Sequence, residues 1–191
     1  MLRITGGRFR GREIAVPVAS GKQETRPSKA RLRQALFNSL QMLVPGSRVL
    51  DLFAGSGSLG FEALSRGAAA VVAVETARPA LSVLQGNAKI LQLEPAEYRW
   101  LAHPVEECWQ DALRDGPFDI VMADPPYADG WELNLLNETP LEKILVPEGV
   151  FVLEWGLVKS KIEILPDETP LLVKIREKLY GDSGLTTYRR K

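Results

Sequence analysis

The chain has 191 residues, a formal net charge of zero at pH 7, and a composition that is 45% hydrophobic and 25% charged. This length and composition favour one globular domain with a short extension and exclude a mainly disordered chain. Because Cys108 is the one cysteine, an internal disulfide is excluded, and no uncharged apolar run approaches the roughly 18 residues that span a bilayer. We therefore expect a reduced, soluble protein of the cytoplasm that has no membrane partner.

Positive charge is concentrated at the N-terminus. Residues 1–33 contain nine Lys or Arg and two Glu, whereas residues 34–150 contain seven basic and sixteen acidic residues. Ile4, Phe9 and Ile14 recur between polar residues of the basic segment, a pattern that predicts a small β-hairpin. A basic hairpin favours a polyanionic partner, although a merely solvated charged segment would have the same composition.

Hydrophobic periodicity predicts alternating helices and strands along the rest of the chain. Helices are expected at 29–43, 58–66, 79–91, 106–113 and 133–145, and strands at 48–53, 69–75, 98–101, 118–123, 150–154, 162–165 and 172–178. Residues 18–27 are interpreted as a polar loop, and residues 180–191 as the exit from the last strand. This alternation predicts an α/β fold, with helices on both faces of a mostly parallel sheet. The expected units are a basic β-hairpin extension at 1–27 and one domain at 28–191.

A glycine-rich turn lies between the strand predicted at 48–53 and the helix predicted at 58–66. Its residues Gly55-Ser56-Gly57-Ser58-Leu59-Gly60 match the Gly-x-Gly-x-x-Gly pattern of nucleotide-type cofactor loops. Glu75 ends the next predicted strand, where an acidic residue can accept hydrogen bonds from both hydroxyls of a ribose. Strand, glycines, helix, strand and acid together predict a nucleotide-type cofactor site.

Asp51, just upstream of these glycines, decides which cofactor is expected. A carboxylate there is an awkward neighbour for a pyrophosphate, which argues against a nicotinamide cofactor and an oxidoreductase. It suits S-adenosylmethionine, which carries a sulfonium, an ammonium group and no phosphate. A structural turn or helix-N-terminal carboxylate is the alternative role for Asp51. The candidate cofactor-binding residues are Asp51, Phe53, Ala54, Gly55, Ser56, Gly57 and Glu75, and no metal site is expected.

A second motif, Asp124-Pro125-Pro126-Tyr127, follows the strand predicted at 118–123. The carboxyl ends of parallel strands meet at one edge of a sheet, so this motif and the glycine-rich turn are expected to share that edge. Asp124 and the Pro125 carbonyl form an acceptor-only pair, which can take both hydrogens of a planar amine and leave its lone pair for a methyl donor. Tyr127 can stack on the heterocycle that carries the amine. A proline turn capped by an aspartate is the structural alternative.

The two motifs together resemble S-adenosylmethionine-dependent methyltransferases that act on amino groups of nucleobases. More narrowly, residues 2–188 resemble the RsmD family, bacterial methyltransferases of the guanine N2 amine in 16S ribosomal RNA. Four further segments support this resemblance: Arg3-Ile4-Thr5-Gly6-Gly7-Arg8-Phe9-Arg10-Gly11-Arg12, Arg26-Pro27-Ser28, Arg31-Leu32-Arg33-Gln34-Ala35-Leu36-Phe37-Asn38 and Tyr180-Gly181-Asp182-Ser183-Gly184.

The resemblance implies a Rossmann-like class I methyltransferase, with a seven-stranded, mostly parallel sheet and a small N-terminal β extension. It implies that Asp124, Pro125, Pro126 and Tyr127 act on a guanine flipped out of its stack. The implied partner is 16S ribosomal RNA or the small ribosomal subunit, and the chain is expected to act as a monomer. The arginines expected to hold RNA phosphates are Arg3, Arg8, Arg10, Arg12, Arg26, Arg31 and Arg33.

The sequence departs from the family pattern at two places. Lys29 and Ala30 stand where the family more often has Thr and Asp. After the strand at 98–101 an acidic residue is expected near the adenine, and this chain leaves that role to Glu106 or to the backbone. Two other functions stay open: a DNA adenine-N6 or cytosine-N4 methyltransferase, and a non-catalytic RNA-binding assembly factor. Methylation at carbon 5 of cytosine is excluded, because Tyr127 stands where the cysteine nucleophile would follow the proline pair.

Overall fold

The computed structural model describes residues 1–17, 27–126, 130–156 and 165–191, without the side chains of residues 27 and 28. In chain order its elements are β1 (Leu2–Arg3), β2 (Glu13–Ile14), α1 (Pro27–Ser39), β3 (Arg48–Leu52), α2 (Ser58–Ser65), β4 (Ala70–Val74), α3 (Arg78–Ile90), β5 (Tyr98–Leu101), η1 (Val105–Glu107), α4 (Trp109–Asp115), β6 (Phe118–Ala123), α5 (Trp131–Glu138), α6 (Leu141–Ile144), β7 (Leu145–Gly156), β8 (Leu172–Tyr180) and β9 (Ser183–Arg190).

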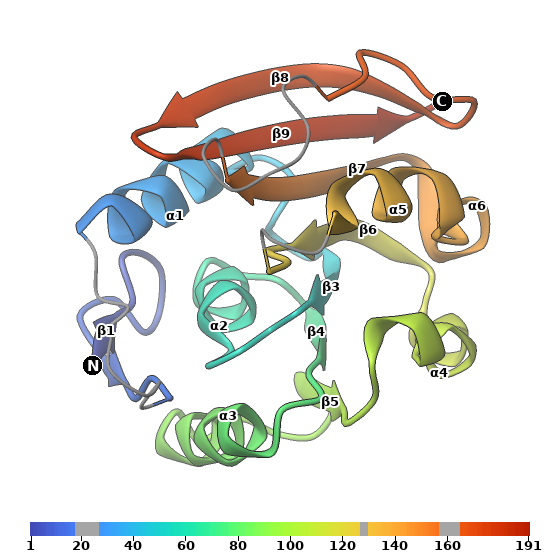
Figure 1. The fold of residues 1–191 in the computed structure, drawn as a ribbon. Coiled ribbons are helices and arrows are strands. Elements are labelled where there is room, and N and C mark those ends of the chain that lie inside the picture. The colour runs from blue at the N-terminus through green and yellow to red at the C-terminus, as the bar shows by residue number, and fades with distance from the viewer. Residues whose placement is uncertain (18–26, 127–129, 157–164) are drawn as a thin grey trace.

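The described strands form a seven-stranded sheet in the order β5-β4-β3-β6-β7-β9-β8, with β1 and β2 as a separate pair. The neighbours from β5 to β7 are parallel, and β9 pairs antiparallel with both β7 and β8. The predicted α/β class and the mostly parallel sheet are therefore confirmed (Figure 1).

Helices cover both faces of this sheet. Figure 1 shows α1, α2 and α3 on the face that also carries β1, and α4, α5 and α6 on the opposite face. Successive residues of a strand point to opposite faces, so Val49 packs among the first group of helices and Leu50 among the second. Within the described residues, no helix is long and apolar enough to cross a membrane.

The basic N-terminal segment forms the expected hairpin, because β1 pairs antiparallel with β2. The hairpin is docked on the domain: Ile4 and Ile14 are buried in the core beside α1, α2 and α3. The Thr5 amide and hydroxyl donate to the buried Glu62 carboxylate of α2, and the Ala15 amide donates to Asn87 of α3. The division at residue 27 stays a prediction, because residues 18–26 lie outside the described part of the chain.

Two sequence predictions about the C-terminal half are wrong. The helix expected at 133–145 is divided, since α5 ends at Glu138, α6 is a separate short helix, and Leu145 already begins β7. Pro140 explains the division, because the residue before a proline favours an extended backbone, as Thr139 adopts here. Residues 180–191, interpreted as a strand exit, contain β9 instead. Of the strand expected at 162–165, only Leu165 lies in the described residues, and it is buried outside any strand.

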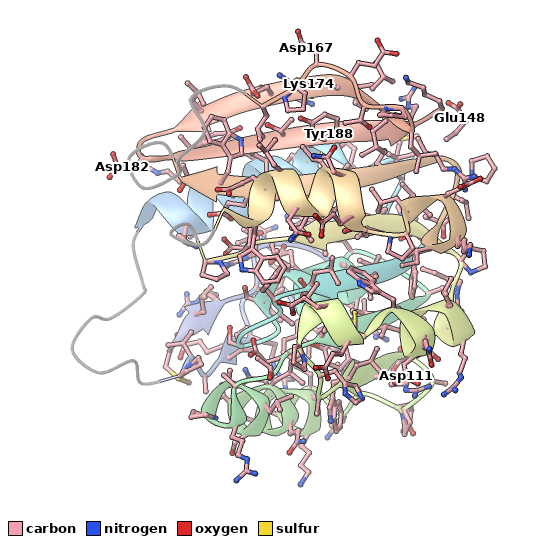
Figure 2. The ribbon with its side chains drawn as sticks, turned by 45° about the vertical axis from the view of Figure 1, so that its right-hand side comes forward. Asp111, Glu148, Asp167, Lys174, Asp182 and Tyr188 are labelled. Atoms are coloured by element: carbon pink, nitrogen blue, oxygen red, sulfur yellow. The ribbon has the colours of Figure 1, made fainter. Side chains whose placement is uncertain are left out.

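Side-chain hydrogen bonds explain how the polar β9 enters the sheet. The Thr186 hydroxyl accepts a hydrogen bond from the Trp155 indole at 3.0 Å and donates to Glu177 at 3.1 Å. Figure 2 labels Tyr188, whose hydroxyl donates to the Pro166 carbonyl, and Lys174, whose ammonium pairs with Asp167. The bonds of Thr186 and Tyr188 satisfy two polar side chains that β9 turns inward, so the strand tolerates a composition with little hydrophobic alternation.

Candidate active site

A cavity of about 680 Å³ lies at the carboxyl ends of β3, β4 and β6. In an open parallel sheet this is the edge where ligands bind. The loop after β3, the end of β4, the segment after β5 and the motif after β6 contribute to its wall, together with α1 and β7. Leu2 and Val16 extend the wall from the N-terminal hairpin. The residues that line the cavity include Lys29, Phe53, Ala54, Gly55, Ser56, Glu75, His103, Pro104, Val105, Glu106, Asp124, Pro125, Pro126, Trp131 and Glu154.

The turn after β3 has a left-handed backbone at three positions, with φ of 60° at Phe53, 55° at Gly55 and 81° at Gly57. A Cβ atom at Gly57 would lie 2.5 Å from a ring carbon of Phe61 and 2.8 Å from the Tyr98 hydroxyl, so the turn needs glycine there. A Cβ atom at Gly55 would meet nothing within 4 Å, in keeping with its place on the cavity wall. Phe53 accepts a conformation that costs a non-glycine residue on the order of 1 kcal/mol, a feature common at binding sites.

Glu75 closes the turn from the end of β4. One carboxylate oxygen accepts the Gly55 amide at 2.8 Å. The other accepts the amides of Thr76 and Ala77, at 2.9 and 2.7 Å, immediately before α3. Glu75 therefore lies against the glycine-rich turn inside the cavity wall, where an acidic group can meet ribose hydroxyls.

Asp51 lies beneath this turn, fully buried and outside the cavity lining. Its Oδ2 accepts the Gly60 amide at 2.9 Å, which ties β3 to α2, and its Oδ1 has no hydrogen-bond partner. Burial raises the pKa of Asp51 to about 7, the Gly60 hydrogen bond opposes this, and the charges of Asp124 and Glu75 add to it. The predicted direct contact between Asp51 and the cofactor thus stays a prediction, since the structure shows a carboxylate behind the turn with one oxygen unused.

The segment after β5 forms the wall next to Glu75. His103, Pro104, Val105 and Glu106 all line the cavity. His103 is half exposed in this wall and its Nε2 lies 3.5 Å from Asp111. The place where an acidic residue was expected near an adenine therefore does face the cavity, with Glu106 as its carboxylate.

The second motif lies across the cavity from this wall. Asp124, Pro125 and Pro126 all line the cavity; the Asp124 side chain is 28% exposed and Pro125 is buried. Tyr127 lies outside the described residues. Trp131 lines the cavity and contacts the Phe53 ring edge-on with 5.0 Å between centroids. The predicted meeting of the glycine-rich turn and the Asp-Pro-Pro segment at one sheet edge is what the structure shows.

Two further charged residues stand beside Asp124, and the sequence interpretation did not include them. The Lys29 ammonium from α1 lies 2.9 Å from Asp124 Oδ2 and 3.3 Å from Glu154 Oε1. Glu154 follows the apolar run Val150–Leu153 near the end of β7, and its side chain is 6% exposed. A signal for Glu154 was present, since a carboxylate that closes a buried parallel strand is placed at the ligand-binding edge.

Arg33 is placed differently from the prediction that it holds RNA phosphates. It is 4% exposed, its guanidinium donates to the Arg3 carbonyl at 2.8 Å, and it lies 3.5 Å from the buried Glu62 carboxylate. Burial lowers the pKa of Arg33, and the neighbouring Glu62 opposes that effect. Arg33 therefore links the N-terminal hairpin to α1 and α2, and it is too deeply buried to hold an RNA phosphate as predicted.

The other predicted arginines differ in whether the protein itself occupies their charge. Arg3 and Arg8 are exposed and paired with Glu13 and Glu97, at 2.8 and 2.7 Å. Arg12 donates to the Ile90 carbonyl. Arg10 and Arg31 are exposed and have no side-chain partner among the described residues. Arg26 lies outside the described residues.

The chain is similar over its whole length to curated rRNA methyltransferases. It is 31% identical to ribosomal RNA small subunit methyltransferase D of Escherichia coli strain K12, with 100% of this chain and 90% of that protein covered. The Haemophilus influenzae protein of the same name is 31% identical, with 98% and 92% covered.

Solved structures share the fold. An Escherichia coli chain superposes with a TM-score of 0.81 at 32% identity, with 100% of this chain and 98% of that chain covered. The Thermus thermophilus 16S rRNA N2 G1207 methyltransferase RsmC, solved with AdoMet and guanosine, superposes with a TM-score of 0.67 at 24% identity and covers 91% of this chain and 45% of its own. The second likeness is a likeness of fold.

A family model described as conserved hypothetical protein 95 matches residues 2–189, almost the entire chain. The match agrees with the full-length relatives, with the sheet order and with the glycine-rich turn and Asp-Pro-Pro segment that meet in the cavity. The chain therefore belongs to the RsmD family of S-adenosylmethionine-dependent rRNA methyltransferases.

Proposed function

We propose that this protein, acting as a cytoplasmic monomer, transfers a methyl group from S-adenosylmethionine to the N2 amine of a guanine in 16S ribosomal RNA. Its relatives' names support rRNA of the small subunit as the substrate. The observation that carries the proposal is the cavity itself, in which an acceptor-only Asp124–Pro125 pair and a glycine-rich cofactor turn line the same space.

The cofactor half of the cavity comprises Phe53–Ser56, Glu75 and His103–Glu106. Glu75 offers carboxylate oxygens to the ribose hydroxyls, and the open side of Gly55 leaves room for a ligand against the backbone. Asp51 adds a buried carboxyl group with an unused oxygen close behind the turn, which suits a ligand with positive charge and no phosphate. S-adenosylmethionine, when bound, supplies an electrophilic methyl on a sulfonium sulfur.

The base half of the cavity comprises Lys29, Asp124, Pro125 and Glu154. The Asp124 carboxylate and the Pro125 carbonyl each accept one hydrogen of the amine, which leaves the nitrogen lone pair free to attack the methyl carbon. The new nitrogen–carbon bond forms as the sulfur–carbon bond breaks, and the amine then releases one proton. Positioned acceptors of this kind typically lower the activation free energy by on the order of 3 kcal/mol, and the correct orientation of the amine lowers it further.

RNA is held, in this proposal, by the basic N-terminal hairpin and α1. Arg3, Arg8, Arg10, Arg12 and Arg31 are exposed on these elements, and the same hairpin lends Leu2 and Val16 to the cavity wall. A phosphate backbone bound along the hairpin would therefore pass next to the cavity that receives the flipped base. Arg26 and Tyr127 remain part of the proposal as expected phosphate and stacking contacts.

The test is transfer of labelled methyl from S-adenosylmethionine to three substrates: small ribosomal subunits from cells that lack this enzyme, deproteinised 16S RNA, and DNA. Each product is digested to nucleosides. N2-methylguanosine from either ribosomal substrate supports the proposal, and its distribution between particle and naked RNA identifies the preferred form. Label found as N6-methyladenine or N4-methylcytosine in DNA would overturn the substrate assignment, and absence of any transfer would favour a non-catalytic RNA-binding role.

A further inference from the structure

Two carboxylates in the base half face one point. Lys29 Nζ is within 2.9 Å of Asp124 Oδ2 and within 3.3 Å of Glu154 Oε1. The sheet register explains this arrangement, because Ala123 of β6 pairs with Leu153 of β7, so Asp124, directly after β6, and Glu154, still within β7, lie side by side. A second carboxylate beside the amine-binding one is therefore built into the framework of the sheet.

The placement of Glu154 is costly unless its charge is used. Its side chain is 6% exposed, and a buried carboxylate needs a cation or several donors to compensate for its lost hydration. In the structure the Lys29 ammonium contributes to that compensation for both carboxylates. When a base occupies this half of the cavity, both carboxylates need hydrogen-bond donors on the side where they now meet the Lys29 ammonium.

The nucleobases that carry an exocyclic amine differ in the ring nitrogen beside it. In guanine the N2 amine lies between N3, which is an acceptor, and N1, which carries a hydrogen and is the donor beside the amine. In adenine the neighbour of the N6 amine is N1, and in cytosine the neighbour of the N4 amine is N3; both nitrogens are acceptors. An ionised carboxylate is an acceptor only, so it attracts the guanine edge and repels the other two.

We propose that Glu154 is the specificity-determining residue of this site and accepts the N1 hydrogen of guanine while Asp124 and the Pro125 carbonyl hold the N2 amine. The inference rests on the proposed function and supplies the reason why a guanine, rather than an adenine or cytosine, is the base received. Lys29 is a positioning residue that pairs with both carboxylates and holds them directed at one point before the base enters.

The first test uses two nucleosides as probes, guanosine and 2-aminopurine riboside, each titrated into the protein in the presence of S-adenosylhomocysteine. The second nucleoside keeps the amine but has an acceptor in place of the N1 hydrogen. The wild type is expected to bind guanosine at least tenfold more tightly. Glu154→Gln, whose amide can donate to that acceptor, is expected to lose most of this preference. Because 2-aminopurine also lacks the 6-oxygen, the informative quantity is the change of the ratio between wild type and variant.

Glu132→Gln is the matched control. Glu132 is also a fully buried glutamate, but it lies on α5 and outside the cavity wall. This variant is expected to keep the wild-type preference. Glu154→Asp provides a second variant should Glu154→Gln fail to fold. It is expected to keep the preference for guanosine with weaker binding, because the shorter side chain keeps a carboxylate but holds it farther from the base.

Methyl transfer to unmodified small ribosomal subunits separates this inference from the proposed function. Glu154→Gln is expected to lower the yield of N2-methylguanosine at least tenfold, while the affinity for S-adenosylmethionine changes less than about twofold. No N2-methylguanosine from the wild type would overturn the function, and the nucleoside preference would then still decide the role of Glu154. A wild type that binds both nucleosides equally, or a Glu154→Gln variant with the wild-type preference, overturns the inference even if the function stands.

Discussion

The cofactor half and the base half of the cavity are built in different ways. The cofactor half is mostly backbone: a left-handed turn over residues 53–57 and a Glu75 carboxylate bonded to main-chain amides. The base half is made of side chains from three distant segments, Lys29, Asp124 and Glu154, which meet through charge. Substitutions in the first half should therefore disturb folding and cofactor binding together, whereas substitutions in the second half should disturb the reaction in a protein that stays folded.

Asp124→Ala is expected to have the largest effect on activity and to impair the base half while the cofactor half stays intact. Loss of the acceptor that orients the amine should lower the methyl-transfer rate about 10²–10³-fold. The affinity for S-adenosylmethionine, measured by calorimetry, should change less than about twofold, since Glu75 and the glycine-rich turn are held by main-chain hydrogen bonds that do not involve Asp124. Asp182→Asn, an exposed aspartate labelled in Figure 2 and outside the cavity lining, is the control and should transfer methyl at the wild-type rate. A similar loss of cofactor affinity in Asp124→Ala would contradict the division into two halves.

Gly57→Ala should break the cofactor half through its backbone. The new Cβ would sit at φ 81° and 2.5 Å from the Phe61 ring, so left-handed strain and overpacking combine to a loss of about 3 kcal/mol in the free energy of unfolding. Gly46→Ala is matched to it, because φ is 77° there and nothing lies within 4 Å of the added atom. Urea denaturation should show Gly46→Ala losing roughly 1 kcal/mol. Equal losses in the two variants would show that the contact with Phe61 is unimportant.

The same difference explains what could be predicted from the sequence. The glycine-rich turn and Asp124–Pro126 were found because their chemistry follows from a few adjacent residues and from the strand before them. The pairing of Lys29 with Glu154 depends on how α1 docks and how β7 registers on β6, and no local pattern contains either. The mostly parallel sheet could be expected from the α/β alternation, but the entry of β9 depended on hydrogen bonds of Thr186 that have no hydrophobic signature.

Arg33 shows a signal that was present but outweighed. It stands three, four and seven residues before Leu36, Phe37 and Leu40, all buried, so it lies on the apolar face of α1. Its positive charge suggested a surface role, yet the buried Glu62 supplies a partner inside the protein. Helical phase was the better guide here because burial of an arginine depends on a carboxylate that the sequence places 29 residues away.

The buried Asp51 should make the stability of the cofactor half depend on pH. Burial raises the pKa of Asp51 from its ordinary 3.8 to about 7, so folding takes up a proton between these values and stability falls as pH rises through that window. Asp51→Asn keeps an acceptor for the Gly60 amide and should flatten this dependence, gaining on the order of 2 kcal/mol relative to wild type between pH 5 and pH 8. Urea midpoints at the two pH values measure the difference. A wild type and variant whose midpoints move in parallel would exclude a raised pKa.

The smallest effects are expected where the base half continues into the N-terminal hairpin. Arg10 and Arg31 are exposed and have no side-chain partner among the described residues. Arg3, in contrast, forms an ion pair with the Glu13 carboxylate at 2.8 Å. An unpaired arginine brings a full positive charge to a phosphate, so Arg10→Ala and Arg31→Ala should each reduce the slope of log affinity against log salt by about 1.

Arg3→Ala should reduce that slope by less, because its charge is already partly neutralised within the protein. Arg114→Ala serves as the control, since Arg114 lies on α4, on the opposite face of the sheet from the hairpin. Filter binding of 16S RNA fragments over a range of salt concentrations measures the slope. Equal changes for Arg3, Arg10 and Arg114 would mean that total charge matters rather than position, and the hairpin would then lose its place as the RNA-facing surface.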